Sequence, residues 1–204
     1  MLRIYFVRHG ETVWNTKKIF QGKLNSPLTE LGVEQAKKLS VYLKDIHLDK
    51  VYSSPLQRAL DTTNLIIKNR DLPINPIEEF KEINMGEVAG IPKDDFENNF
   101  PEAYFNFWNN PVEYDPSPFK GENYSDLLTR VERGLNKLIE NNENKTILVV
   151  SHGVTLKAIF NIINNKGIDE FSKQEVPANT STTIVEYNNG KFEIINFSDT
   201  THLS

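Results

Sequence analysis

Two stretches of the chain place basic and imidazole side chains directly after a run of apolar, strand-forming residues. The letters YFV are followed by Arg8 and His9, and the letters LVVS are followed by His152. A glycine comes after each histidine, and glycine lets the backbone turn sharply and come close to a ligand. A neutral imidazole is a good nucleophile near pH 7, and a planar guanidinium can grip two phosphate oxygens at once. These residues therefore predict phosphate chemistry at the ends of two strands.

A further arginine, Arg58, follows the segment KVYSS at residues 50–54, in the first turn of a predicted helix. Ligands in open α/β sheets bind beyond the carboxyl ends of the strands, so the two arginines and two histidines are expected to surround one point. A transferring phosphoryl group spreads negative charge over three oxygens, which positive donors stabilise. The flanking arginines also disfavour the imidazolium form and would keep His9 free to attack.

The elements that must position these residues alternate between strands and helices. Apolar runs at 2–7, 50–54 and 146–151 predict strands, and the last run is typical of a central parallel strand. Asn189-Gly190, between two more strand-like runs, indicates a hairpin. A helix is predicted over about 30–44, capped by Thr29, and its apolar stripe consists of Leu28, Leu31, Ala36, Leu39 and Leu43. A second helix is predicted to run to about Lys68 from a capping box formed by Ser54, Pro55 and Gln57. Two more helices are predicted, one after Asn123 and one after His152.

This alternation predicts an α/β fold, a three-layer sandwich with a mostly parallel mixed sheet, helices on both faces and a C-terminal hairpin. The chain 1–204 is interpreted as one domain, with an inserted lid over the site at about 91–120. The lid segment contains eight aromatic residues and six carboxylates, but no arginine and only Lys93 and Lys120. One or two rings are expected at the mouth of the pocket, and the carboxylates are expected to repel a second acidic group on a substrate.

Composition narrows the class of protein. With 204 residues, 38% hydrophobic and 25% charged, the chain resembles a globular protein with a real core. The net charge of -5 argues against a nucleic-acid partner, and no run approaches the ~18 apolar residues of a membrane span. No signal peptide is expected, and the lack of cysteine is compatible with a reducing cytoplasm, the expected location. A small phosphorylated metabolite is the expected partner, and a homodimer is left open.

The sequence resembles the phosphoglycerate mutase-like histidine phosphatases over nearly the whole chain. The motifs that carry the resemblance are RHGET with Asn15, QG at 21–22, SPLT, SSPLQRALDT and SHG, in this order. RHGET alone is moderately specific, whereas the ordered set is highly specific. The similarity is strongest to the small broad-specificity phosphatases of that family. The alpha-ribazole phosphatases of cobalamin synthesis and the 2,3-bisphosphoglycerate-dependent mutases are kept as alternatives.

The resemblance implies a metal-independent phosphomonoesterase that uses no cofactor and forms a phosphohistidine on His9. It implies that Arg8, Arg58 and His152 surround the transferring phosphoryl group. It also implies that Glu82 is the general acid and base, a role that a carboxyl group near the leaving oxygen can fill. The phosphate- and substrate-binding residues that it implies are Asn15, Gln21, Gly22 and Gly153.

Less specific roles stay open for individual residues. Asn15 could serve only its own loop, and Gln21-Gly22 could be only a turn. Ser151 suggests a serine hydrolase, but adjacent strand residues point to opposite faces of a sheet, so it would point away from His152. His47 and His202 are interpreted as surface residues, and Glu78, Glu79 and Glu87 compete with Glu82 for the acid role.

Two other classes of function compete with a phosphatase. A catalytically retired binding module would use the same pocket for recognition, although both arginines and both histidines are present. A metal hydrolase could use His9, His152 and Glu82 as ligands, but neither His-x-His nor His-Glu-x-x-His spacing occurs. The phosphatase is therefore the leading hypothesis.

Overall fold

The computed structural model describes residues 1–204 and contains one six-stranded sheet in the order β3-β2-β4-β1-β5-β6. Strands β3, β2, β4 and β1 are mutually parallel, whereas β5 and β6 run antiparallel, which confirms the predicted mixed sheet with a C-terminal hairpin. The strands are β1 Leu2–Arg8, β2 Lys50–Ser53, β3 Ile74–Pro76, β4 Thr146–Ser151, β5 Thr182–Asn188 and β6 Lys191–Asp199.

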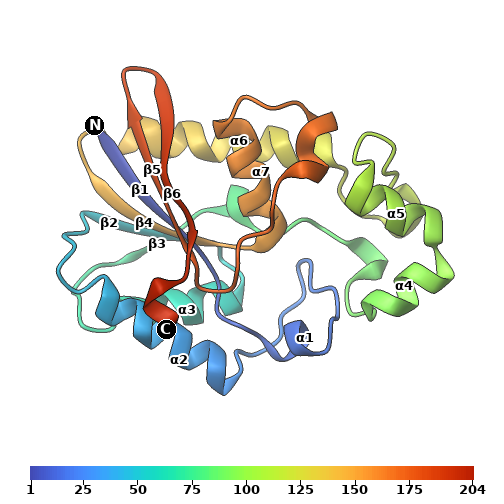
Figure 1. Ribbon diagram of the computed structural model, residues 1–204, viewed down its shortest axis with the longest axis horizontal. Coiled ribbons are helices and arrows are strands. Elements are labelled where there is room, and N and C mark those ends of the chain that lie inside the picture. Colours follow the sequence, from blue (N-terminus) through green and yellow to red (C-terminus); the bar gives the residue numbers. More distant parts are fainter.

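Helices cover both faces of this sheet (Figure 1). Helices α2 and α3 pack on one face and α6 and α7 on the other, so the molecule has three layers. No helix combines the length and the apolar character that crossing a membrane requires. The α-helices are α1 Val13–Thr16, α2 Glu30–Tyr42, α3 Gln57–Ile66, α4 Lys93–Asn99, α5 Pro101–Asn109, α6 Tyr124–Asn141 and α7 Gly153–Ile163. Short 3-10 helices are η1 Glu78–Phe80, η2 Gly86–Val88, η3 Ser117–Phe119, η4 Ile168–Lys173 and η5 Thr201–Leu203.

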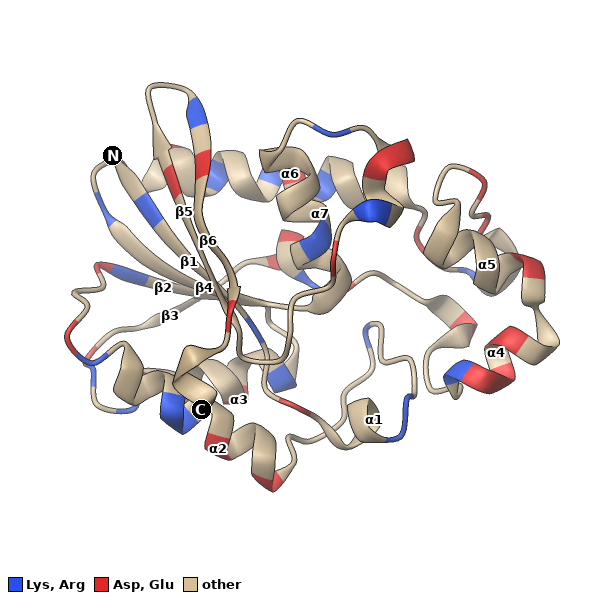
Figure 2. Ribbon diagram, in the orientation of Figure 1, with Lys and Arg blue, Asp and Glu red and all other residues tan.

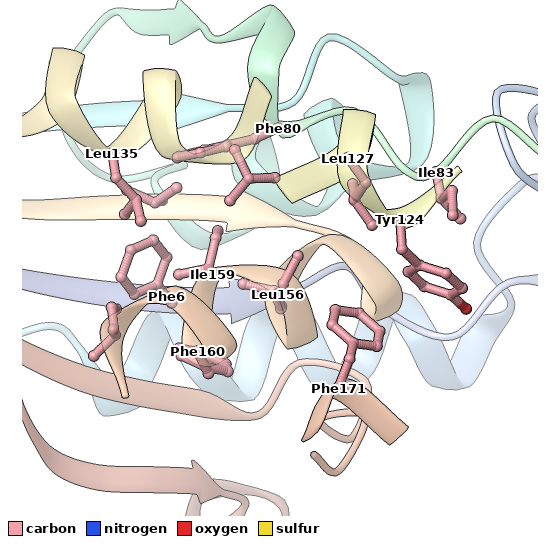
Figure 3. Close-up of a cluster of buried hydrophobic side chains, with 14 of the residues drawn as sticks. Phe6, Phe80, Ile83, Tyr124, Leu127, Leu135, Leu156, Ile159, Phe160 and Phe171 are labelled. Carbon is pink, nitrogen blue, oxygen red and sulfur yellow. The ribbon is translucent and has the colours of Figure 1, made fainter. Parts of the chain in front are cut away.

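The alternating side chains of β1 explain why helices stay on both faces. Tyr5 and Val7 join the apolar cluster beneath α2 and α3, whereas Phe6 joins the cluster completed by α6 and α7. Figure 3 shows this second cluster, in which the rings of Phe6 and Phe160 meet edge to face with centroids 5.8 Å apart. Burial on both faces fixes the strand, and thereby the residues that follow it.

The parallel pairing of β1 with β4 brings their carboxyl ends together. Arg8 lies opposite Ser151, and the N–H of His9 donates to the carbonyl of Ser151 over 3.0 Å. Strand β2 lies on the other side of β4 and pairs its last residue, Ser53, with Val150. Helix α3 follows β2, so the sheet delivers three segments with polar side chains to one edge.

Most predicted elements are confirmed, with local corrections. The Thr29 side chain caps α2 and Asn123 caps α6, as expected, but Leu31 is 52% exposed and does not belong to the buried stripe of α2. Ser54 does not cap a helix, because α3 begins only at Gln57 and Leu56 takes the N-cap position without a side-chain bond.

The sequence also missed two short elements and misjudged one histidine. Strand β3, which the sequence patterns did not predict, adds an edge strand beside β2. Helix α1 was not foreseen; Thr12 and Asn15 form its capping box. His47 is exposed as expected, whereas His202 is half-buried, with its ring centroid 5.6 Å from that of Tyr42.

Residues 91–120, here called the α4–α5 region, are built around aromatic rings. Phe96 is fully buried and packs edge to face on Phe119 and on Phe20, each with ring centroids 5.7 Å apart. Phe20 belongs to the loop after α1, so these contacts join the α4–α5 region to that loop. The acidic residues lie on α4, on α5 and in the loop after α5 (Figure 2), and all of them are exposed.

Candidate active site

His9 stands at the end of β1 with its backbone and ring both fixed. Its N–H donates to Ser151, and the next N–H, of Gly10, donates to the hydroxyl of Thr62 over 3.0 Å. The ring Nδ1 lies 2.8 Å from the carbonyl oxygen of Gly10, so a neutral ring carries its proton on Nδ1. Nε2 has no hydrogen-bond partner in the protein and is not fully covered, although His9 as a whole is 2% exposed. The lone pair of Nε2 is therefore free.

His152 lies beside this ring, with the two imidazole centroids 5.2 Å apart. Its Nε2 is 2.7 Å from the hydroxyl of Ser54, the serine that was expected to cap α3. Its Nδ1 is buried and has no partner in the protein. Ser151, the candidate serine nucleophile, donates its hydroxyl to the carbonyl of Phe80 over 2.9 Å and does not contact the histidine ring. This geometry does not support Ser151 as a nucleophile.

Two arginines complete the group, the half-buried Arg8 and the buried Arg58. Arg8 donates from Nη1 to the carbonyl of Pro177 over 2.7 Å, and Arg58 donates to the carbonyls of Gly22 and Leu24 over 2.8 and 2.7 Å. The Nε atoms of both arginines are buried without a partner in the protein. Buried polar groups normally find partners, so unpaired donors that gather near one imidazole indicate an anion site.

Burial and the nearby arginines together keep the two histidines neutral. Burial lowers the pKa of His9 well below its ordinary value, and the charges of Arg58 and Arg8 lower it further. The pKa of His152 is lowered in the same way, by burial first and then by Arg58. Burial lowers the pKa of Arg58 to about 10, so this guanidinium is still charged at pH 7. The site therefore combines a neutral nucleophile with fixed positive charge.

A cavity adjoins the two histidines and two arginines, and Glu82 is the only one of the four competing carboxylates that lines it. Its two oxygens accept hydrogen bonds from the backbone N–H groups of Val154 and Thr155, over 3.2 and 3.0 Å, in the first turn of α7. The other three are engaged elsewhere, each in an ion pair with a lysine. These pairs are Glu78 with Lys81, Glu79 with Lys137, and Glu87 with Lys120.

The cavity has a volume of about 280 Å³, and its inner wall includes Arg8, Asn15, Glu82 and Gly153. Gly153 has a packing reason, because a Cβ atom there would lie 3.4 Å from the Arg8 guanidinium and 2.9 Å from Val176. His9, Arg58 and His152 are not part of the wall. They adjoin its inner end, because Arg8 precedes His9, Gly153 follows His152 and the carbonyl of Gly22 accepts from Arg58. The predicted binding residues Gln21 and Gly22 also line the cavity.

Asn15 and Gly22 have structural duties as well. The Asn15 side-chain oxygen accepts from the N–H and the hydroxyl of Thr12, both over 3.0 Å, and this capping box starts α1. Gly22 has φ +49° and its carbonyl holds Arg58, so it combines a tight turn with a contact to the site. The loop roles that the sequence left open are present, and they do not keep either residue away from the cavity.

The outer end of the cavity was not foreseen. It is lined by Trp14 and Lys18, which belong to helix α1 and the loop after it, together called the α1 loop, and by Lys93 and Trp108 from the α4–α5 region. The N–H of Lys93 donates to the carbonyl of Lys18 over 2.8 Å, which brings the two lysines together. The Lys93 ammonium lies 5.4 Å from the ring centroid of Trp108, whose indole nitrogen is buried without a partner.

The α4–α5 region therefore differs from the expectation in its charge. None of its six carboxylates lines the cavity, and the only acidic residue in the wall is Glu82. The structure does not support the expected repulsion of a second acidic group, because the carboxylates are exposed to solvent while Lys93 lines the cavity. The expectation that one or two rings reach the pocket is confirmed, by Phe107 and Trp108. No group of three or more His, Cys, Asp or Glu side chains is arranged to hold a metal ion.

Known proteins resemble this chain in sequence and in fold. The family model of the histidine phosphatase superfamily, branch 1, matches residues 4–200. The chain belongs to this superfamily. A histidine phosphatase is a phosphoric monoester hydrolase, which agrees with the unpaired donors around His9.

Individual relatives cover the histidine phosphatase from end to end. The uncharacterized phosphatase PhoE of Bacillus subtilis is 31% identical over 204 residues, covering 100% of this chain and 98% of its own length. A metal-independent phosphoserine phosphatase of Arabidopsis thaliana is 32% identical, covering 98% of this chain and 83% of its own. The solved structure of YhfR from Bacillus stearothermophilus matches with a TM-score of 0.95, at 32% identity and full coverage of both chains.

Proposed function

We propose that this histidine phosphatase hydrolyses small phosphomonoesters through a phosphohistidine on His9, with Glu82 as general acid and base. The observation that carries the proposal is the free Nε2 of His9 among buried, unpaired donors of Arg8, Arg58 and His152. Asn15 donates from its side-chain amide to a phosphoryl oxygen. Residues 91–120 act as a lid within a single domain.

In the first step, the Nε2 lone pair attacks the phosphorus atom and forms a nitrogen–phosphorus bond. The ester oxygen–phosphorus bond breaks, and the leaving oxygen takes a proton from the carboxyl group of Glu82. The guanidinium groups of Arg8 and Arg58 stabilise the charge on the three equatorial oxygens. The lowered pKa of His9 ensures that the attacking ring is neutral at pH 7.

In the second step, a water molecule attacks the phosphorus atom and gives its proton to Glu82. The nitrogen–phosphorus bond breaks, inorganic phosphate leaves, and His9 regains its lone pair. Glu82 is then protonated and ready for the next ester. Its carboxyl group lies against the first turn of α7, and two backbone N–H groups of that turn keep it at the cavity wall in both steps.

The outer end of the cavity supports a substrate that carries an acidic group beside its phosphate. Lys18 and Lys93 are the only charged groups there, and the indole N–H of Trp108 is a further donor. The name of the Arabidopsis relative, a phosphoserine phosphatase, is compatible with this chemistry. A neutral body such as a nucleoside would leave the two ammonium groups unused.

Trapping the intermediate tests the mechanism. Labelled substrate is mixed with enzyme and quenched rapidly, and an acid-labile, base-stable phosphate is expected on His9. It should be lost in His9→Ala, whereas His47→Ala, a change at an exposed histidine, should keep it. Phosphate on a serine or aspartate would overturn the mechanism.

A phosphoglycerate mutase is the second candidate, since it would share the phosphohistidine and the acidic substrate. The two reactions differ in their products. A phosphatase releases one inorganic phosphate for each 3-phosphoglycerate consumed, whereas a mutase releases almost none and forms 2-phosphoglycerate. We expect stoichiometric phosphate release, and activity that survives EDTA.

A further inference from the structure

The segment between η4 and β5, residues 174–181, packs against the residues that carry the chemistry. Its Pro177 carbonyl accepts from the guanidinium of Arg8, and its Thr180 N–H donates to the carbonyl of Arg8 over 3.0 Å. Between them, Asn179 points its side chain toward the start of the α1 loop. This segment was not singled out by the sequence, and the mechanism above does not use it.

The side-chain amide of Asn179 joins two parts of the site. Its nitrogen lies 2.9 Å from the carbonyl oxygen of His9 and 3.5 Å from the side-chain oxygen of Asn15. An amide NH2 group has two hydrogens, so one nitrogen can donate to both acceptors. Asn179 is therefore placed to hold the nucleophile's backbone and the phosphate-binding amide in a fixed relation.

Hydrogen bonds to its oxygen determine how the Asn15 amide is turned. Its oxygen accepts from the N–H and hydroxyl of Thr12 as well as from Asn179, so three donors gather on one oxygen. The NH2 group of Asn15 must then point the other way, and it makes no hydrogen bond within the protein. Asn15 lines the cavity, which leaves this NH2 group available to a phosphoryl oxygen.

The loop that carries Asn179 is itself held in place. The Thr180 hydroxyl donates to the carbonyl of Asn179 over 2.8 Å, and the Ser181 hydroxyl donates to the carbonyl of Ala178 over 2.8 Å. Thr180 has φ +53°, an unfavourable conformation for a β-branched residue. Strained backbone of this kind persists where the surrounding contacts impose it, often beside a functional site.

We propose that Asn179 is a positioning residue for phosphoryl transfer, which orients the amide of Asn15 toward the phosphoryl group without touching the substrate itself. The inference rests on the proposed function, in which Asn15 donates to the phosphoryl group. An alanine at 179 would leave the Asn15 oxygen bound to Thr12 alone and remove the link to the His9 carbonyl, so the amide would lose part of its fixed orientation toward the phosphoryl group.

A double-mutant cycle on p-nitrophenyl phosphate tests this. Asn15→Ala removes a hydrogen bond to a charged group, so kcat/KM should fall about 10- to 100-fold. Asn179→Ala should lower it about tenfold, mainly in kcat, since the lost contact acts on the transition state. In the Asn15→Ala background, Asn179→Ala should then cost no more than about threefold, because its target is gone.

Asn161→Ala is the matched control for a purely structural effect. Asn161 is buried whereas Asn179 is half-buried, but its amide nitrogen likewise bridges two acceptors, the carbonyls of Lys166 and Gly167 at 2.8 and 3.2 Å. Both alanine variants should lower the melting temperature, but only Asn179→Ala should lower kcat. Equal kcat in the two variants would assign Asn179 a structural role and overturn the inference.

The remaining outcomes distinguish a failure of the positioning role of Asn179 from a failure of the proposed function. If Asn15→Ala is impaired but Asn179→Ala is fully active, or if the two losses multiply, the positioning role is wrong and the phosphatase mechanism stands. If Asn15→Ala is as active as the wild type, the proposed role of Asn15 is wrong and the positioning role is wrong with it.

Discussion

The two ends of the cavity are built in different ways. The inner end is made by residues that directly follow strands or begin helices, and its histidines and Arg58 are at most 2% exposed. The outer end is made by the α1 loop and the α4–α5 region. Lys18, which lies there, is exposed and has a positive φ of +53°. Side chains at the inner end are held by backbone hydrogen bonds, whereas the lysines at the outer end have long, flexible stems.

This difference separates chemistry from selection. Phosphoryl transfer needs groups that are already in place when charge develops, and the sheet edge supplies such groups. Recognition of the alcohol part tolerates flexible groups on loops, which can change without disturbing the core. We therefore expect changes at the inner end to affect all substrates, and changes at the outer end to affect only acidic ones.

The largest loss is expected from Arg58→Ala. An arginine that stabilises a transferring phosphoryl group is typically worth about 10³- to 10⁵-fold in kcat, so all substrates should lose at least about 10³-fold. Arg70→Ala is the matched control, because Arg70 likewise holds two backbone carbonyls, those of Ile46 and Leu43, but lies away from the cavity. Steady-state kinetics on p-nitrophenyl phosphate would measure both. A similar loss in the two variants would reduce the role of Arg58 to loop support.

The next largest loss is expected from Glu82→Gln, and it should depend on the leaving group. General acid–base help is worth about 10²- to 10⁴-fold, so an alkyl phosphate should lose activity in this range. p-Nitrophenyl phosphate should lose less, since its leaving group is stable as an anion. Glu79→Gln, at the carboxylate paired with Lys137, should leave both rates unchanged. Equal losses on the two substrates for Glu82→Gln would indicate a structural role.

A smaller and selective loss is expected from Lys93→Met. A hydrogen bond to a charged group is worth about 1.5–3 kcal/mol, so kcat/KM for 3-phosphoglycerate should fall about 10- to 100-fold. Glycerol 3-phosphate has a hydroxymethyl group in place of the carboxylate and should change less than about threefold. Lys120→Met, at an exposed lysine paired with Glu87, should alter neither rate. Parallel losses on both substrates would contradict the assignment of the outer end.

The smallest effect is on stability and comes from the buried histidines of the inner end. Folded His9 and His152 have pKa values well below the ordinary value, so below about pH 6.5 the unfolded chain binds protons that the folded chain does not. The contribution of these histidines to the free energy of unfolding is thus fully present above this pH, and it is lost as the pH is lowered toward the folded pKa values. Urea unfolding should show a loss of about 1 kcal/mol per histidine between pH 6.5 and 5.5.

Histidine NMR provides a direct check of the same prediction. The ring signals of His9 and His152 should not titrate near pH 6.5, and His152→Asn should reduce the fall in stability on acidification. Titration of either ring at or above its ordinary pKa would mean that burial and the charges of Arg58 and Arg8 do not act on the histidines as the structure indicates.

The sequence by itself determined the layers and the family. Strand and helix periods, the Thr29 and Asn123 caps and the Asn189-Gly190 turn are local signals, and each depends on neighbours within a few residues. The glycine-flanked histidines after two apolar strands also revealed the inner end of the cavity, because parallel strands must end at one edge. Ordered motifs over nearly the whole chain added the predicted roles of Glu82 and Asn15.

Tertiary structure alone decided the rest. Nothing local turns the carboxylates of the α4–α5 region outward or sets Lys93 beside Lys18; packing of aromatic rings between the region and the α1 loop does so. Ser54 has the sequence of a helix cap but contacts His152 instead, 98 positions along the chain. Asn179 reaches His9 across 170 positions. Such contacts arise only when distant segments share one core, so they leave no periodic or capping signal in the sequence.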